Sequence, residues 1–390
     1  MNINVEPESS PAATNPAPTS RWRRLFRAWH WPTDPKQRLW ARLSVIIIIG
    51  AILGGVIWAV IRQSNNKTAD DGNDNGAKIA EEVAAPTTVN SVLDGLAYDA
   101  ALAGRRPIAV MVENHPDARP QFGLSRASVV YEAIAEGGIT RYMAIFGPQD
   151  TERVGPIRSA RTYYIDWATE YNAIYTHAGG ASNALEKLRT GILNDIDQQN
   201  PPTMWRQRRA KESSEHTLYS STIKLRDYAI AKGWSQAIDV AGWTFVADAR
   251  PEADRLAAAT AKTVTIPWSS ASFQTAWTYD ATKNVYLRAL ASKSDTDAAT
   301  NEQLSATNLV IQVMNRKEIT AAGKTVGDLT LYGSGDAWVV KGGQFVKGTW
   351  KKEKEKARTR YYDGAGVEIP LIPGRTWVSV IQPNITPAIQ

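Results

Sequence analysis

Cysteine is absent from the 390 residues of this chain. Disulfide bonds, thiolate metal ligands, cysteine nucleophiles and lipid attachment to a cysteine are therefore all excluded. Histidine is scarce, with 4 residues, and neither a GxSxG nucleophile elbow nor an HExxH zinc motif occurs. The folded part must be stabilised by packing, and any acid-base chemistry by histidine must use one of these few residues.

A long uncharged apolar run, Leu43 to Ile61, lies near the N-terminus. Its nineteen residues, at about 1.5 Å each in a helix, match the thickness of a bilayer hydrocarbon core, and we expect a single transmembrane helix. The preceding segment, 1–42, is basic, so the positive-inside rule predicts a cytoplasmic N-terminus and an extracytoplasmic remainder at the cell membrane. A cleavable signal peptide is the alternative, but its apolar core would be shorter and a small-residue cleavage site is lacking.

The net charge of +6 comes mainly from this leader. Residues 1–42 hold seven basic and three acidic residues, which gives +4 and leaves the rest of the chain nearly neutral. The basic composition is thus no argument for a nucleic-acid partner, and we expect none. Residues 62–91 are rich in Asn, Asp, Ala and Thr with few large apolar residues, which predicts a flexible linker.

The remaining pattern predicts an α+β protein. We expect an α/β domain with a mixed sheet at 92–240, a connector at 241–260, a mostly antiparallel β-rich domain at 261–383 and a tail at 384–390. In the first domain, the expected strands are 106–114, 141–146 and 173–177, and the expected helices are 125–136, 159–170, 183–190 and 223–232. In the second domain, short β-rich runs begin at 263, 273, 284, 308, 337, 344 and 376, and Gly342-Gly343 predicts a hairpin turn.

Several long motifs carry a resemblance to a known family. They are RPIAVMVENHPDARPQFGLSRASVVYEAIAEGGITRYMAIF from Arg106, VGPIRSARTYYIDWATEYNAIYTHAGG from Val154, EHTLYSST from Glu215, and the closing TRYYDGAGVEIPLIPGRTWVSVIQP. Together they resemble the YerB-like family of bacterial proteins described as lipoproteins. The resemblance covers most of Val92 to Pro383 and implies an envelope-located protein of two domains without an assigned activity. This chain departs from the lipoprotein pattern, because it has a predicted membrane helix and no cysteine to carry a lipid.

Two loops lead through glycine into an expected helix, Gly155 to Arg161 and His177 to Ser182. Free N–H groups at a helix start and nearby arginines can bind an anion, so we interpret these loops as a cradle for a phosphate or carboxylate. The alternative is structural: the arginines would pair with Asp166, Glu170, Glu132 or Glu136. The candidate ligand-binding residues are Glu113, Asn114, His115, Arg141, Arg158, Ser159, Arg161, His177, Gly179, Gly180 and His216.

The leading functional hypothesis is a non-catalytic binding or scaffold module for an anionic component of the cell envelope. The alternative is an envelope hydrolase or transferase that uses His177 or His216 as a base, with Ser159 or Ser182 as nucleophile. A base must then lie within about 3.2 Å of a serine hydroxyl or an activated water. A structural or signalling protein without a small ligand is the third class.

Expected partners are the membrane, through Leu43 to Ile61, and an anionic envelope polymer or a membrane protein. No cofactor and no metal are expected, because Asp166 and Glu170 stand four apart without the spacing of a known metal motif. The mixed-charge run Lys347 to Arg360 is typical of a solvated strand end. Contact between this run and an anionic polymer or lipid is the other interpretation.

Overall fold

The computed structural model describes residues 88–199, 202–208, 213–237 and 240–390. All of them belong to one compact unit, residues 83–390. The expected leader and membrane helix, and most of the expected linker, lie outside the described residues. Within the described ranges, no helix is long and apolar enough to cross a membrane.

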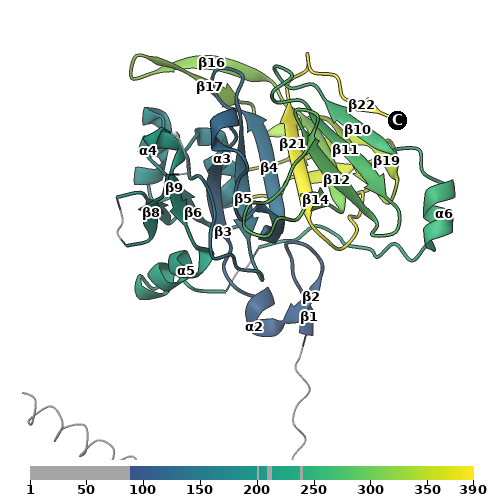
Figure 1. The fold of residues 1–390 in the computed structure, drawn as a ribbon, viewed down its shortest axis with the longest axis horizontal. Coiled ribbons are helices and arrows are strands. Elements are labelled where there is room, and N and C mark those ends of the chain that lie inside the picture. The colour runs from purple at the N-terminus through teal and green to yellow at the C-terminus, as the bar shows by residue number, and fades with distance from the viewer. Residues whose placement is uncertain (1–87, 200–201, 209–212, 238–239) are drawn as a thin grey trace, which may run out of the picture. The chain divides into compact units, whose positions relative to one another are not determined.

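A mixed ten-stranded sheet forms the centre of the unit, with strand order β20-β19-β18-β15-β21-β4-β5-β3-β6-β7 (Figure 1). Its N-terminal strands are β3 (Ile108–Glu113), β4 (Val129–Ile134), β5 (Thr140–Phe146), β6 (Ile174–His177) and β7 (Asp195–Asp197). Its C-terminal strands are β15 (Asn308–Val313), β18 (Gly333–Lys341), β19 (Gln344–Lys352), β20 (Arg360–Tyr362) and β21 (Thr376–Ile381). The two sequence halves meet where β21 pairs in parallel with β4, Trp377 opposite Val130, so the two expected domains share one sheet.

A six-stranded antiparallel sheet is built from the second half of the chain alone. It contains β10 (Thr263–Ile266), β11 (Thr275–Asp280), β12 (Val285–Leu290), β13 (Lys293–Ser294), β14 (Ser305–Ala306) and β22 (Ala388–Ile389). Two-stranded pairs are β1 (Thr88–Asn90) with β2 (Ala97–Asp99), β8 (Met204–Arg206) with β9 (Leu218–Ser220), and β16 (Arg316–Ala321) with β17 (Lys324–Leu329). The second half is thus mostly antiparallel, as expected.

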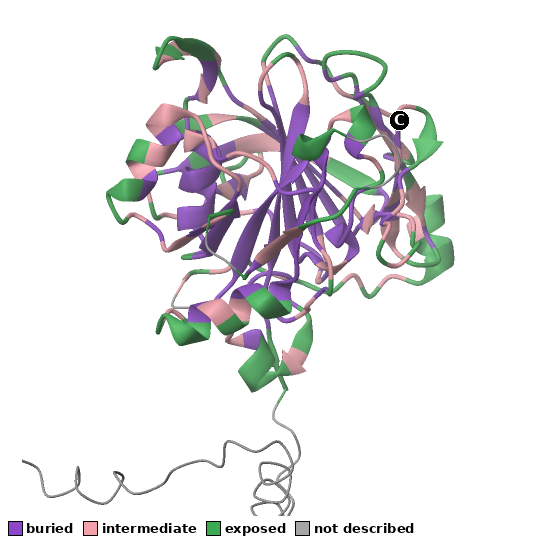
Figure 2. Ribbon diagram, turned by 60° about the vertical axis from the view of Figure 1, so that its left-hand side comes forward, coloured by how far each residue is buried: buried purple, intermediate pink, exposed green. Residues whose placement is uncertain are grey.

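The helices are short: α2 (Ala100–Ala103), α3 (Thr162–Thr169), α4 (Ser182–Arg189), α5 (Thr222–Ala231) and α6 (Glu252–Ala257), with 3₁₀ turns η2 (Pro116–Ala118), η3 (Leu124–Arg126) and η4 (Ser214–His216). Alternate residues of the central strands enter two apolar cores. Tyr131 and Met143 belong to the core under α3 and α4. Val130 and Tyr142 belong to the other core, which also takes up α5 and the six-stranded sheet. Buried residues accordingly fill the middle of the unit in Figure 2.

One secondary-structure prediction is wrong: residues 125–136 contain strand β4 rather than a helix. The helical spacing of Val129 and Ala133 is real, but every residue from Val129 to Ile134 is buried. A strand covered on both faces needs no polar alternation, so it can imitate the pattern of a buried helix. Neighbouring strands on both sides, β5 and β21, decide between the two.

The other expected strands and helices of the first domain are confirmed within a few residues, as β3, β5, β6, α3, α4 and α5. The β-rich runs of the second half are confirmed as β10, β11, β12, β15, β18, β19 and β21. The hairpin at Gly342-Gly343 is confirmed as well, because Lys341 pairs with Gln344 across it. Both glycines have positive φ, 55° and 76°, as a two-residue turn of this kind requires.

Candidate functional site

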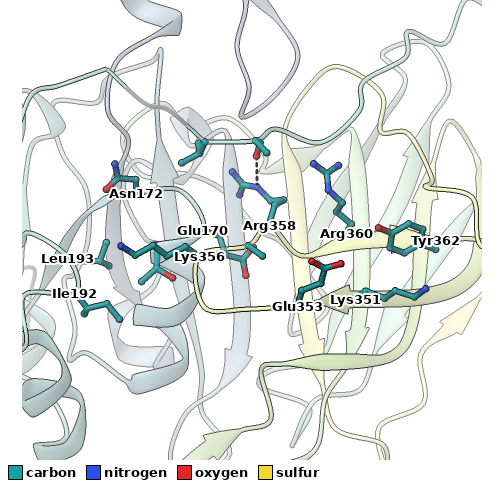
Figure 3. A pocket seen from close by; sticks show the side chains of 14 residues that line it. Glu170, Asn172, Ile192, Leu193, Lys351, Glu353, Lys356, Arg358, Arg360 and Tyr362 are labelled. Atoms are coloured by element: carbon teal, nitrogen blue, oxygen red, sulfur yellow. Dashed lines mark hydrogen bonds between the residues drawn. The ribbon is translucent and has the colours of Figure 1, made fainter.

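A cavity of about 520 Å³ opens where the end of α3 faces the segment between β19 and β20 (Figure 3). Both halves of the chain contribute to its walls. The lining residues are Thr169, Glu170, Asn172, Ile192, Leu193, Val240, Ala241, Lys351, Glu353, Lys356, Ala357, Arg358, Arg360 and Tyr362. We call this space the seam cavity. A single shared sheet makes it possible, because the sheet holds the two halves in fixed register.

Arg358 is the most informative residue of the seam cavity. Its side chain is buried, 6% exposed, and its guanidinium lies 3.6 Å from the centre of the Tyr171 ring and 5.2 Å from that of Trp243. Nε donates to the carbonyl of Ala241 at 3.1 Å. Both terminal nitrogens, Nη1 and Nη2, are buried and make no hydrogen bond of regular geometry within the described residues. The guanidinium does interact with the Tyr171 hydroxyl, where burial raises the pKa and Arg358 opposes that rise. A stacked guanidinium keeps its in-plane donors available, and these fit a carboxylate or a phosphate.

The charged side chains around Arg358 make the seam cavity cationic. Lys351 and Lys356 are exposed and form no ion pair within the described ranges, whereas Arg360 is paired with Glu368 at 2.7 Å. Among the described lining residues, the acidic ones are Glu170 and Glu353. Within this part of the chain, Arg358, Lys351 and Lys356 have no acidic partner, and they line a space that an anion could enter.

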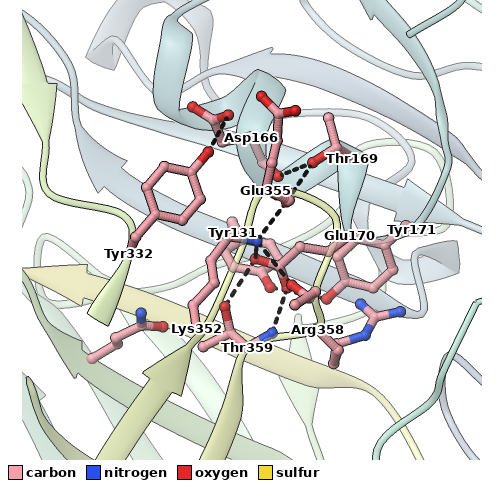
Figure 4. Close-up of polar contacts among 12 residues, drawn as sticks. Tyr131, Asp166, Thr169, Glu170, Tyr171, Tyr332, Lys352, Glu355, Arg358 and Thr359 are labelled. Carbon is pink, nitrogen blue, oxygen red and sulfur yellow. Dashed lines mark hydrogen bonds and ion pairs between the residues drawn. The ribbon is translucent and has the colours of Figure 1, made fainter. Parts of the chain in front are cut away.

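Glu170, at the end of α3, binds the segment between β19 and β20 that contains Arg358 (Figure 4). Its carboxylate accepts from Thr359 N at 2.9 Å, from Thr359 Oγ1 at 2.8 Å and from Lys352 Nζ at 2.8 Å. Lys352 also donates to the carbonyls of Glu355 and Ala357, each at 2.9 Å. The segment between β19 and β20 is thus fixed to α3, which positions the guanidinium of Arg358 against Tyr171.

Of the carboxylates named in the structural interpretation, Glu136 does pair with Arg161, whereas Asp166 and Glu170 pair with lysines. Asp166 accepts from Lys187 Nζ at 2.5 Å. Burial raises the pKa of Asp166 in spite of this lysine. The two carboxylates thus have separate cationic partners and serve the packing of α3.

The two glycine loops of the sequence prediction do lie side by side. Ala178 N donates to the carbonyl of Arg158 at 3.0 Å, and Ala160 N donates to the carbonyl of Gly179 at 2.9 Å. Their anion-binding groups, however, are occupied by carboxylates of the protein. Gly179 N donates to Asp197 Oδ1 at 2.7 Å, and Arg161 forms an ion pair with Glu136. Ser159 contributes its carbonyl, which accepts from Arg141 at 3.0 Å.

The remaining candidate residues gather at the end of β3. Glu113 accepts from Arg158 Nε and contacts His216 Nδ1, each at 2.8 Å. Asn114 is buried and donates to Thr140 Oγ1 at 2.6 Å. The ring of His115 stacks on that of His216 with 4.9 Å between centroids. The eleven candidates therefore fall into two groups, one at the end of β3 and one at the paired glycine loops with Arg141. Gly180 belongs to the second group, because it forms a β-bridge with Ala160.

The histidine contacts do not form the arrangement of a serine hydrolase. His177 lies 2.8 Å from the carbonyl of Gly179 and 3.1 Å from Asp195 Oδ2, so both of its ring nitrogens have protein partners. Ser221 and Lys224 have the SxxK spacing of one hydrolase class. Ser221 is instead the N-cap of α5, accepting from Ile223 N at 3.2 Å, and Lys224 is exposed.

Arg358 was not predicted from the sequence as a site residue, although it lies in the mixed-charge run Lys347 to Arg360. Within that run, only the fold distinguishes Arg358 from the exposed lysines. Its ring partners Tyr171 and Trp243 are far away in the sequence and were expected to lie in other domains or connectors. The run Lys347 to Arg360 was therefore the one sequence signal that pointed toward the seam cavity, and it could not identify Arg358 as the residue that matters.

Two family models match this chain: the N-terminal domain of a protein of unknown function, DUF3048, over residues 93–235, and the DUF3048 C-terminal domain over residues 264–378. A Bacillus subtilis (strain 168) protein described as "Putative lipoprotein YerB" is 30% identical over 293 residues, which cover 74% of this chain and 85% of that protein. The crystal structure of the YerB protein from Bacillus subtilis matches with a TM-score of 0.68 at 27% identity, covering 77% of this chain and 99% of that chain. Sequence and fold are thus similar over both halves.

Proposed function

Because this chain belongs to the YerB-like family, with DUF3048 N-terminal and C-terminal domains, we propose that it is a membrane-tethered binding or scaffold module for an anionic component of the cell envelope. The observation that carries the proposal is the buried guanidinium of Arg358, which lines the seam cavity and whose terminal nitrogens make no regular hydrogen bond within the described residues. Burying such donors costs free energy unless a partner satisfies them. An oxyanion in the seam cavity supplies that partner.

The ligand chemistry follows from the geometry of the donors. A planar guanidinium binds a carboxylate or a phosphate through two parallel hydrogen bonds, and Lys351 and Lys356 add positive charge at the opening. A repeating anionic polymer can extend from the buried guanidinium toward these exposed lysines. Binding is favoured over hydrolysis, because His177 and His216 contact Asp195 and Glu113 rather than a serine hydroxyl.

Membrane tethering is the second part of the proposal. The apolar run Leu43 to Ile61 supplies the anchor, and the Bacillus relative described as a lipoprotein supports a location outside the cytoplasm. In a bacterial host, the full chain should sediment with membranes and be digested by protease added to intact spheroplasts. A chain without residues 1–62 should be recovered in the soluble fraction. Protection of the full chain from external protease would contradict the proposed orientation.

The binding proposal can be tested with the purified full chain in detergent. Titration calorimetry with inorganic phosphate and with soluble polyphosphate should detect binding, tighter for the polymer. Arg358→Gln should weaken it about 10- to 100-fold, the effect of losing hydrogen bonds to a charged group. Lys293→Gln, which removes an exposed lysine outside the seam cavity, serves as the matched control. Thermal melting establishes that each variant is folded.

A second variant separates the seam cavity from the glycine loops. Arg161→Gln removes the arginine that Glu136 already neutralises. If Arg161→Gln abolishes binding and Arg358→Gln does not, the ligand binds at the glycine loops and the seam cavity proposal is wrong. Absence of phosphate and polyphosphate binding at low ionic strength would remove the basis for an anion-binding function.

A further inference from the structure

His115, Asp117 and His216 come together outside the seam cavity, His115 and Asp117 at least partly exposed and His216 buried. A ligand atom of each lies within 4.8 Å of those of the others. His115 and Asp117 belong to the turn that follows β3, and His216 ends η4. We propose that these three side chains form a binding site for a divalent transition-metal cation of the Zn²⁺ type. Imidazole and carboxylate are ligands that such cations accept.

The contact between Glu113 and His216 supports the site independently of this grouping. Glu113 Oε2 lies 2.8 Å from Nδ1 of His216, and both side chains are buried. A carboxylate only accepts, so Nδ1 is the donor of this hydrogen bond, and in the neutral ring the lone pair is then on Nε2. Metal-binding histidines are commonly oriented by a carboxylate on the other ring nitrogen. Arg158 holds Glu113 from the other side at 2.8 Å.

One separation in the cluster already matches a small coordination sphere, and the others lie within 4.8 Å. Ligands at about 2.0–2.1 Å from Zn²⁺ in a tetrahedron lie about 3.4 Å from one another. The distance from His115 Nδ1 to Asp117 Oδ2 is 3.5 Å, and Nδ1 accepts a hydrogen bond from Asp117 N at 3.3 Å. A metal ion lies in the plane of each imidazole that binds it, so the His115 ring must turn out of its stack on His216 to share an ion with it. The side chains of His115 and Asp117 are 33% and 70% exposed and have room to move, while buried His216 stays in place. Glu215 Oε1, 3.7 Å from His216 Nε2, or a water molecule can complete the sphere.

The charge of the surroundings favours a cation. Three carboxylates contact the two histidines directly: Glu113, Asp117 and Glu215. One guanidinium, that of Arg158, contacts two of these carboxylates. Among the described residues in direct contact, three negative charges and one positive charge leave a formal charge of −2, which a divalent cation neutralises. Arg119 and Arg206 lie just outside this set, where they donate to the carbonyls of Asn114 and Ser214. The proposal is independent of the anion-binding function, because no residue of this cluster lines the seam cavity.

The test uses the full chain after treatment with a chelator. Titration with Zn²⁺ alone, followed by calorimetry, should give one tight site, and Co²⁺ should give the visible absorption of a four-coordinate complex with nitrogen ligands. His115→Gln and Asp117→Asn should each weaken Zn²⁺ binding at least tenfold. Glu113→Gln should weaken it about 10- to 100-fold, as loss of an orienting carboxylate does. Asp227→Asn, an exposed carboxylate on α5, is the control and should leave the affinity unchanged.

His115 and Asp117 are the decisive positions, because their side chains are 33% and 70% exposed and their substitution leaves the core intact. Circular dichroism verifies folding of each variant. Unchanged Zn²⁺ affinity in both His115→Gln and Asp117→Asn overturns the site, as does the lack of any binding of Zn²⁺ or Co²⁺ to the full chain.

Discussion

Lys352 Nζ donates to Glu170 Oε1 at 2.8 Å, and neither side chain is exposed to solvent. Lys352 belongs to β19 in the second half of the chain, and Glu170 follows α3 in the first half. Two charges are thus removed from water together, at the place where the halves meet beside the seam cavity. Such a pair can be retained only if its hydrogen bonds are complete, and here three acceptors surround the lysine and three donors the carboxylate.

Removal of one partner should therefore be costly. Lys352→Met leaves the Glu170 carboxylate buried with only the donors of Thr359, and we expect a loss of about 3–5 kcal/mol in the free energy of unfolding. Urea denaturation measures this loss. The double variant Lys352→Met with Glu170→Leu is the matched control and should be much less destabilised, because no unpaired charge remains. A loss below about 1 kcal/mol in the single variant would contradict the expectation.

Arg288 forms the corresponding ionic link between the two large sheets. Its buried guanidinium lies 3.0 Å from Glu132 on β4 and is also paired with Asp295. Arg288→Met should cost about 3–5 kcal/mol at pH 7, because both carboxylates lose their cation. Burial already raises the pKa of Glu132 above its usual 4.5.

The raised pKa of Glu132 determines how the effect of Arg288→Met on stability changes with pH. A carboxyl whose folded pKa is raised contributes stability below its unfolded pKa and loses it as the pH rises. The destabilisation by Arg288→Met should thus be smaller at pH 4.5 than at pH 7, and urea denaturation at the two pH values tests this. Equal destabilisation at both values would show that Glu132 is not left charged in the variant.

Gly348 positions β20, which ends in the wall of the seam cavity. A Cβ at Gly348 would overlap the backbone carbonyl of Tyr362, which cannot move away as a side chain can. We expect Gly348→Ala to cost about 1–3 kcal/mol and to weaken phosphate binding. Gly364→Ala is the control, because a Cβ there meets nothing within 4 Å, and its effect should stay within about 0.5 kcal/mol. Equal stability of the two variants would contradict the steric argument.

The ion pair of Glu136 with Arg161 should appear in the pH dependence of stability. Burial opposes the ionisation of Glu136, but Arg161 and Arg141 outweigh it and lower its pKa. A lowered carboxyl pKa stabilises the fold above the unfolded value near 4.5, and this contribution is lost as the pH falls through the folded pKa. The stability difference between the native chain and Glu136→Gln should therefore shrink between pH 6 and pH 3. A difference independent of pH would refute this role.

Local sequence patterns were sufficient to predict a strand or turn where the tertiary surroundings of a segment favour the same backbone structure as its own residues. The apolar run of β3 and the double glycine between β18 and β19 both have the predicted structure. Apolar side chains favour burial and glycine accepts a positive φ, so the residue types alone were enough to predict these two segments. The family was also recognisable from contiguous motifs. In contrast, β4 was predicted as a helix, since only the strands on either side of it reveal why all of its residues are buried.

The candidate site depended on contacts between distant segments. The anion cradle predicted at Arg161 and Gly179 was chemically sound, but the fold brings Glu136 and Asp197 to those same donors. No spacing rule places a carboxylate from one strand beside a loop from another. The metal-type cluster was overlooked for the same reason, because His216 reaches His115 from a segment about one hundred residues away.

The sequence by itself determined the absence of cysteine chemistry, the apolar run Leu43 to Ile61, most strands and helices, and membership of the family. Only the tertiary structure decided which charges are neutralised and which remain available. It paired Arg158 and Arg161 with carboxylates and stacked Arg358 on Tyr171, where its terminal nitrogens make no regular hydrogen bond to the part of the chain that the structure describes. The physical reason is that backbone preferences depend on neighbouring residues, whereas the partner of a charge depends on which remote segments the sheet brings within about 4 Å.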